Sequence, residues 1–368
     1  MIFSGFEFVS WHHLELYSNQ TVEMNETKCE LAFQLTYHPI YRLSQFYTFS
    51  ISVLAAPALL YLMVKKLFRL HFHGNLKTLL IAYLISIFLY AVIVCFDFGY
   101  HFFVPFFVTS KCNLIIDKSL YKYIHVPTLF LLTTPMMFPI GFSIERFIAV
   151  GMSCRYEKTP TLLGPILPFL LPLPNILIFY SIFKNEKYDD SFISFLMLPN
   201  TSAVQFNNYI WYLLYLKIGN LVLNFFLLLM HRRLKTRYLL QKSSLSMRYA
   251  MEEILQSSKF TLAITFTHLL FFGTYTICSI LVRVLGEPFF DSFINHSVAR
   301  GVNCAIPTYN LVIVLVSFQS LRHLNSKRYL EVQTTVQLKT TGDEGARNYE
   351  EATINKWATI TSGRMGAI

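Results

Sequence analysis

The chain has 368 residues, of which 54% are hydrophobic and 14% are charged, and it contains 35 Phe and 22 Tyr. This composition is too apolar and too aromatic for an ordinary soluble domain. The net charge of +10 does not indicate nucleic-acid binding, because the basic residues gather beside long apolar runs, where they suit the surface of a membrane. We therefore predict an integral membrane protein whose surroundings are a lipid bilayer.

Seven apolar runs follow one another along the chain. A helix of about twenty residues crosses the hydrocarbon core of a bilayer, which is roughly 30 Å thick. Barrel strands would instead show segments of about ten residues with alternating polarity. The fold class we expect is therefore an all-α membrane protein, a seven-helix bundle (44–320) with helices at about 44–64, 76–97, 123–144, 162–183, 209–230, 258–282 and 298–320.

The polar segments at the two ends are expected to lie outside the bundle. Residues 1–43 form an N-terminal segment, 321–333 a short amphipathic helix beside the membrane, and 334–368 a disordered tail that is poor in apolar residues. The apolar patch at 99–111 is short and interrupted by Pro105, so it is expected to be an interfacial loop. The tail threonines are candidate phosphorylation sites, which makes an arrestin or a kinase a candidate partner there: Thr334, Thr335, Thr340 and Thr341.

Loop charge predicts the orientation of the bundle. The loops at about 65–75, 145–161 and 231–257 carry many more Lys and Arg than Asp and Glu, whereas the intervening segments do not, and positively charged loops favour the cytoplasmic side. This places the N-terminus outside. The four Asn-x-Ser/Thr glycosylation acceptors all fall on the predicted outer side: Asn19, Asn25, Asn200 and Asn295.

Six cysteines occur without a CxxC motif or a metal-ligand spacing, so we expect neither a metal nor a cofactor. Cys29 and Cys112 both fall in outer polar segments, where the compartment is oxidising, and this predicts a disulfide between them. The alternative is two free or separately buried thiols. Cys154, beside the membrane on the inner side, is either a palmitoylation site or an unmodified thiol.

The segment "IERF" places an acid and a base directly after a long uncharged run. Seven helices with an outer N-terminus match the architecture of G-protein-coupled receptors. Glu145, Arg146 and Phe147 then resemble the acidic-Arg-aromatic triplet of rhodopsin-like receptors, which implies that Arg146 leaves its acidic neighbour on activation and contacts a heterotrimeric G protein. The alternative is a charged pair that only ends a membrane helix. The seventh helix has "IPTYN" in place of Asn-Pro-x-x-Tyr, which puts that part of the switch in doubt.

Several ordered blocks resemble the nematode serpentine receptors of class beta, within the alpha superfamily of nematode chemoreceptors. These blocks include "YHPIYRLSQFYTF", "FHGNLKTLLIAYLIS", "FPIGFSIERFIA" and "VARGVNCAIPTYNLVIV", and the resemblance runs from about Tyr37 to the tail. It implies a plasma-membrane receptor of sensory neurons or their cilia. Such a receptor binds small environmental molecules and signals through a heterotrimeric G protein.

Ionisable groups within a membrane helix are costly and are therefore candidates for function. Lys217 lies well inside the fifth run and shares a helix face with Asn220 and Asn224, and His268 lies inside the sixth run. Lys217 would suit an anionic or carbonyl-bearing ligand. The alternative is that these side chains bond neighbouring helices.

Further polar residues lie near the outer ends of the helices. His125 and Thr128 are candidate ligand contacts, and Asp97 and Arg300 are expected to be interfacial charges. On the inner side, Arg232, Arg233 and Lys235 are candidate contacts for a G protein. Attraction to anionic lipid is the simpler alternative for such residues.

Other functional classes fit the sequence less well. A chemosensory channel of the inverted seven-helix type would place the N-terminus inside, against the loop charges. A transporter should show matched broken helices in two repeats, yet prolines gather in the third and fourth runs alone. An intramembrane enzyme would need paired acids, a metal cluster or a Ser/His pair within the helices, and the acids of these runs lie at their ends.

Overall fold

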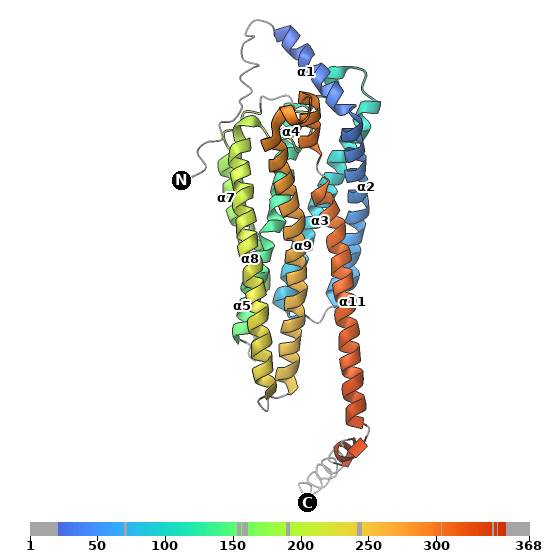
Figure 1. Ribbon diagram of the computed structural model, residues 1–368, viewed down its shortest axis with the longest axis vertical. Coiled ribbons are helices and arrows are strands. Elements are labelled where there is room, and N and C mark those ends of the chain that lie inside the picture. Colours follow the sequence, from blue (N-terminus) through green and yellow to red (C-terminus); the bar gives the residue numbers. More distant parts are fainter. Residues whose placement is uncertain are drawn as a thin grey trace, which may run out of the picture. The chain divides into compact units, whose positions relative to one another are not determined.

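The computed structural model describes residues 21–69, 72–152, 156, 161–188, 192–240, 245–302, 304–340, 342–343 and 345–350. The contacts within the chain divide it into two units, residues 1–314 and 315–368. In the first unit the long helices run side by side, and α1 (Thr21–Thr36) lies across one end of them (Figure 1).

The first two spans are long helices with irregular ends. After α1 (Thr21–Thr36), α2 (Pro39–Tyr61) begins with a proline, whose missing N–H is of no consequence at a helix start, and it continues as a π-helix at Leu62–Lys66. α3 (Gly74–Phe103) is capped by His73 and continues as a 3-10 turn at Val104–Phe106.

Proline divides the third and fourth spans. α4 (Lys118–Thr133), capped by Asp117, and α5 (Phe138–Met152) are joined by a 3-10 turn at Thr134–Met136, which contains Pro135 and is followed by Pro139 in α5. α6 (Leu163–Leu170) and α7 (Pro172–Phe183) meet at Leu171, directly before a proline. Proline lacks the donor that continues a helix and its ring collides with the preceding turn, which favours these two breaks. Proline does not always break a helix here, because Pro57, Pro127 and Pro168 lie inside α2, α4 and α6.

The remaining helices are α8 (Asn200–Leu240), α9 (Leu245–Phe289), α10 (Phe293–Gly301) and α11 (Ala305–Thr340). Among the described residues, seven helical segments are long and apolar enough to cross a membrane, which confirms the predicted seven-helix fold class. These segments are Pro39–Lys66, Gly74–Phe106, Lys111–Met152, Leu163–Phe183, Thr201–Leu234, Met251–Val282 and Phe293–Leu324.

The structure differs from the sequence prediction in several segments. The N-terminal segment contains α1, and α3 continues through residue 103 into the patch expected to be a loop. α11 runs without a break through 321–333 and on to Thr340, inside the segment expected to be disordered. This stretch has neither Gly nor Pro after Pro307, and its Leu, Gln, Lys and Arg residues favour a helix.

α3 lies at the centre of the first unit and packs against α2, α4, α5 and α6. It comes into close backbone contact with α6, because Gly164 leaves room for the backbone of Asn75. A Cβ atom on Gly164 would lie 2.7 Å from the Cα of Asn75, and the Gly164 N–H donates a 2.8 Å hydrogen bond to the Asn75 Oδ1. This contact fixes the ends of α3 and α6 beside Arg146, which is described below.

Candidate functional site

The structure contains the expected disulfide between Cys29 of α1 and Cys112 of a short 3-10 helix, Lys111–Leu114. The residues beside the two cysteines also pair, since Lys111 Nζ lies 2.5 Å from Glu30 Oε2. The hydrogen bond from Lys111, and a weaker one from Gln34, lower the pKa of the Glu30 carboxyl below its ordinary value. We call this part of the bundle the disulfide end.

The segment between α7 and α8 packs into the bundle. Phe192 and Phe195 are each 1% exposed, and the Phe192 ring stacks on Tyr121 of α4 with 3.6 Å between ring centroids. His125 Nδ1 donates to the Phe195 carbonyl at 2.6 Å, and the Phe195 N–H donates to His101 Nε2 at 3.3 Å. His125, predicted as a ligand contact, thus holds the backbone of this segment.

Thr128, the other predicted contact on α4, donates to Asp97 Oδ2 at 3.2 Å. Asp97 is 4% exposed, so it is a buried group of α3 and not the interfacial charge that we expected. The sequence prediction was wrong because it placed the end of the helix at Asp97, whereas α3 continues beyond it to Phe103. Arg300 is exposed, as expected of an interfacial charge.

A second group of polar residues joins four helices in the middle of the bundle. Lys217 Nζ on α8 lies 3.0 Å from His268 Nε2 on α9, and His268 Nδ1 lies 3.5 Å from the Tyr83 hydroxyl on α3. The Tyr83 and Tyr309 hydroxyls are hydrogen-bonded, and the His268 and Tyr309 rings stack with centroids 4.8 Å apart. We call Tyr83, Lys217, His268 and Tyr309 the Lys217 cluster.

The electrostatics of this cluster are unusual. Lys217 is 3% exposed, and its ammonium lies 4.1 Å from the ring centroid of Phe272. Among the ion pairs of the described residues, none involves Lys217. When Lys217 is an ammonium group, which has no acceptor, Nε2 of His268 accepts this hydrogen bond and the proton of the neutral ring is on Nδ1. The sequence analysis singled out Lys217 and His268, and the structure brings them together.

Asn220 and Asn224 contact α5 from the next turns of α8. Ser143 donates to Asn220 Oδ1 at 2.5 Å, and Asn224 Nδ2 donates to Ser143 Oγ at 2.6 Å, so both amides join the two helices. This is the interhelical role that the sequence analysis gave as the alternative. The Nδ2 of Asn220 is buried and has no hydrogen-bond partner among the described residues.

Glu145 and Arg146 form the third group, which we call the Arg146 cluster, together with Tyr156 and Ser257. Arg146 is 2% exposed and Glu145 is fully buried. Arg146 Nε and Nη2 contact the two oxygens of the Glu145 carboxylate at 2.5 and 2.6 Å. Nη1 of Arg146 donates to Ser257 Oγ on α9, so the arginine links α5 to α9.

Tyr156 completes the cluster from the connection after α5, where its hydroxyl donates to Glu145 Oε1. Burial, and next the negative charge of Glu145, raise the pKa of Tyr156, which keeps the hydroxyl protonated as a donor. Its ring lies 4.2 Å from that of His73, the residue that caps α3. Glu145 therefore receives donors from two directions, which suits a buried carboxylate.

The other residues predicted for coupling lie on the surface. Phe147 is 61% exposed, and Arg232 and Arg233 are exposed near the end of α8. The side chain of Lys235 lies outside the described residues, as do Asn19, Cys154, Thr341 and the side chains of Asn25, Asn200, Thr334, Thr335 and Thr340. Asn295 is exposed on α10.

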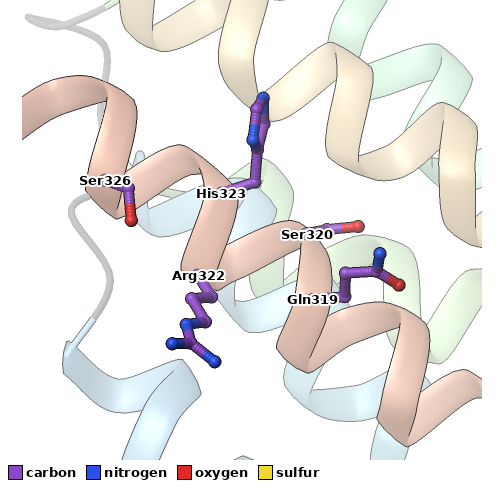
Figure 2. A pocket seen from close by; sticks show the side chains of 5 residues that line it. All are labelled: Gln319, Ser320, Arg322, His323 and Ser326. Atoms are coloured by element: carbon purple, nitrogen blue, oxygen red, sulfur yellow. The ribbon is translucent and has the colours of Figure 1, made fainter.

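In the second unit, a depression with a volume of about 450 Å³ follows one face of α11. Figure 2 shows its five polar side chains, all carried by this helix: Gln319, Ser320, Arg322, His323 and Ser326. Among the described residues, no group of three or more His, Cys, Asp or Glu side chains is placed to hold a metal ion.

Four residues of these clusters were not predicted as site residues: Tyr83, Tyr156, Ser257 and Tyr309. Each is an uncharged hydroxyl in a chain with many of them, so composition gave no reason to choose it. The sequence did give a signal for Tyr309, because this residue lies in "IPTYN", the segment that takes the place of Asn-Pro-x-x-Tyr in the seventh helix.

Seven membrane-crossing helices with a buried acid-arginine pair at the end of the third span define a protein of the serpentine receptor class. Residues 37–272 match the sequence profile of the family described as serpentine type 7TM GPCR chemoreceptor Srb, and the chain belongs to this family. It is 70% identical over 338 residues to serpentine receptor class beta-13 of Caenorhabditis elegans, covering 92% of this chain and 98% of the relative. It is 61% identical to class beta-5 of the same organism, covering 92% and 99%.

Proposed function

We propose that this receptor binds a small environmental molecule within the bundle and activates a heterotrimeric G protein at the end that carries Arg146. The observation that carries the proposal is the placement of Arg146, which is buried between Glu145 of its own helix and Ser257 of α9. An arginine held in this way can reach a partner only if α5 and α9 separate. Activation is then a shift between two helix arrangements.

The Lys217 cluster supports the ligand-binding part of the proposal. A charge within a membrane helix costs about 2.5–3.5 kcal/mol by insertion scales, and no carboxylate of the described residues offsets this cost for Lys217. The Nδ2 of Asn220, one helical turn away, is buried without a partner. A ligand with a carboxylate or a carbonyl group would supply acceptors to both donors. His125 and Thr128 would then have a structural role at the disulfide end. His125 holds the segment between α7 and α8, and Thr128 holds the carboxylate of Asp97.

The direct test removes the link between α5 and α9 without leaving a charge unpaired. In Ser257→Ala, Arg146 keeps both contacts to Glu145 and its attraction to the charge of Glu253 on α9, but it loses its hydrogen bond to that helix. A hydrogen bond to a charged group contributes about 1.5–3 kcal/mol, so basal G-protein activation should rise by about tenfold or more. The measurement is nucleotide exchange on a purified heterotrimer, at matched surface expression.

Ser258→Ala is the matched control, since the Ser258 hydroxyl bonds the Ile254 carbonyl of its own helix. It should signal as the wild type does. Arg146→Ala should abolish coupling while the receptor still reaches the cell surface. Basal activity unchanged in Ser257→Ala, or raised equally in Ser258→Ala, would remove the role assigned to this link.

We further propose that the receptor lies in the plasma membrane of sensory neurons or their cilia with its N-terminus outside. The loop charges and the four glycosylation acceptors support this orientation. The exposed Arg232 and Arg233 would then lie on the cytoplasmic side, beside the Arg146 cluster, where an acidic surface of a G protein could contact them. The tail is the proposed contact for a kinase or an arrestin.

A further inference from the structure

A groove with a volume of about 580 Å³ runs along the surface between α8 and α9, which lie side by side in Figure 1. Its walls come from one stripe on each helix. On α8 the stripe includes Leu221, Phe225 and Arg232, and on α9 it includes Lys259, Ala263 and Phe266. The separations of four, seven and eleven residues place the members of each stripe on one face of their helix.

The two ends of the groove differ in charge. α8 and α9 are consecutive spans and run in opposite directions. Arg232, near the end of α8, and Lys259, near the start of α9, therefore lie at the same end of the groove. The other lining residues are apolar. The groove therefore combines an apolar channel with a pair of cations at its mouth.

The dimensions of the groove match one leaflet of a bilayer. Leu221 and Arg232 are eleven residues apart, about 16 Å along a helix and about half of the hydrocarbon thickness. Phe225 and Phe266 are each 55% exposed and belong to the spans Thr201–Leu234 and Met251–Val282. In a bilayer, side chains at these positions would meet acyl chains, and the long side chains of Arg232 and Lys259 could extend toward the headgroups.

We propose that this groove is a binding site for one anionic glycerophospholipid, with an acyl chain between Phe225 and Phe266 and its phosphate beside Arg232 and Lys259. Charge complementarity selects the occupant. A zwitterionic headgroup has no net charge to offset a pair of cations, whereas an anionic headgroup brings net negative charge there. The proposal concerns a lipid and does not depend on the G-protein function.

The test compares phosphatidylserine with phosphatidylcholine of identical acyl chains, titrated into the full-length receptor in mild detergent and counted by native mass spectrometry. The wild type should retain one phosphatidylserine in preference to phosphatidylcholine. Arg232→Gln and Lys259→Gln should each reduce this preference about fivefold, and the double variant about twenty-five-fold, because each basic residue contributes about that factor. Arg233→Gln removes the same charge at the adjacent position, which does not line the groove, and should keep the preference.

Two further measurements separate the lipid from other occupants. Ala263→Trp should weaken phosphatidylserine binding while both cations remain, because the indole fills the apolar channel. Soluble glycerophosphoserine should not displace the lipid. An unchanged preference in the Arg232→Gln/Lys259→Gln double variant, an equal loss in Arg233→Gln, or full displacement by glycerophosphoserine would overturn the proposal. The single variants decide the question if the double variant does not fold.

Discussion

Lys217 of α8 and His268 of α9 are hydrogen-bonded in the middle of the bundle, with 3.0 Å between Nζ and Nε2, and both side chains are buried. The pair is made of two basic groups, so it does not neutralise charge as a salt bridge does. When two basic groups are in contact, the state in which only one of them is positively charged is favoured, because two positive charges repel each other in a medium of low dielectric constant. A ligand that carries negative charge would relieve this cost.

Lys217→Met should therefore raise the stability of the ligand-free receptor, by up to about 3 kcal/mol, and abolish its response to small acids. The measurement is thermal unfolding in detergent with hexanoate or with hexanol, which differ in charge and match in length. The wild type should be stabilised more by hexanoate, and Lys217→Met equally by both. Lys122→Met, which removes an exposed lysine at the disulfide end, should behave as the wild type. Equal effects of the two compounds on the wild type would contradict the assignment.

Much of the fold follows from the sequence because bilayer thickness fixes the length of each span. The third and fourth spans divide beside prolines, but Pro127 and Pro168 lie inside helices of the same spans, so the prolines alone do not predict where each span divides. The ends of the helices were less predictable. α3 continues beyond Asp97, and this acid is buried inside the bundle, where Thr128 of another helix donates a hydrogen bond to it. No local pattern in the sequence reports that contact.

The candidate site was predictable only where placing a residue's ionisable group within or beside a membrane span is by itself unfavourable in free energy. Lys217, His268, Glu145 and Arg146 stand out as ionisable groups in or beside apolar runs. Their partners Tyr83, Tyr309 and Ser257 come from other helices and are ordinary residues when read singly. Which hydroxyl meets which charge depends on helix rotation and close approach, as at Gly164, and these are properties of the packed bundle.

Gly164→Ala should destabilise the receptor by about 1–3 kcal/mol, because the added Cβ would meet the backbone of Asn75, which cannot move aside as a side chain can. Gly219→Ala is the matched control, since nothing lies within 4 Å of its Cβ position on α8. It should leave stability unchanged or raise it by up to about 1 kcal/mol. Apparent melting temperatures of the two variants in the same detergent test this directly. Equal melting temperatures would show that α3 and α6 are not in the close contact described.

Removal of the disulfide with Cys29→Ser/Cys112→Ser should cost about 2–4 kcal/mol, because the bond closes a long loop between residues 83 apart in the sequence. Reductant should lower the melting temperature of the wild type to that of the double variant and leave the variant itself unchanged. Cys278→Ser, which replaces an exposed free cysteine, should melt as the wild type does. A wild type that is insensitive to reductant would show that the two thiols are not joined in the purified protein.

The orientation of the bundle is the prediction on which the direction of signalling depends. With epitope tags at the N-terminus and in the tail, intact cells should expose the first tag and protect the second. Glycosidase should shift the wild-type band, and Asn19→Gln/Asn25→Gln should reduce this shift, because both acceptors precede the first span. A protected N-terminus with an exposed tail would turn Arg146 outward, where no G protein could reach it. The seven-helix channel would then become the better account of this chain.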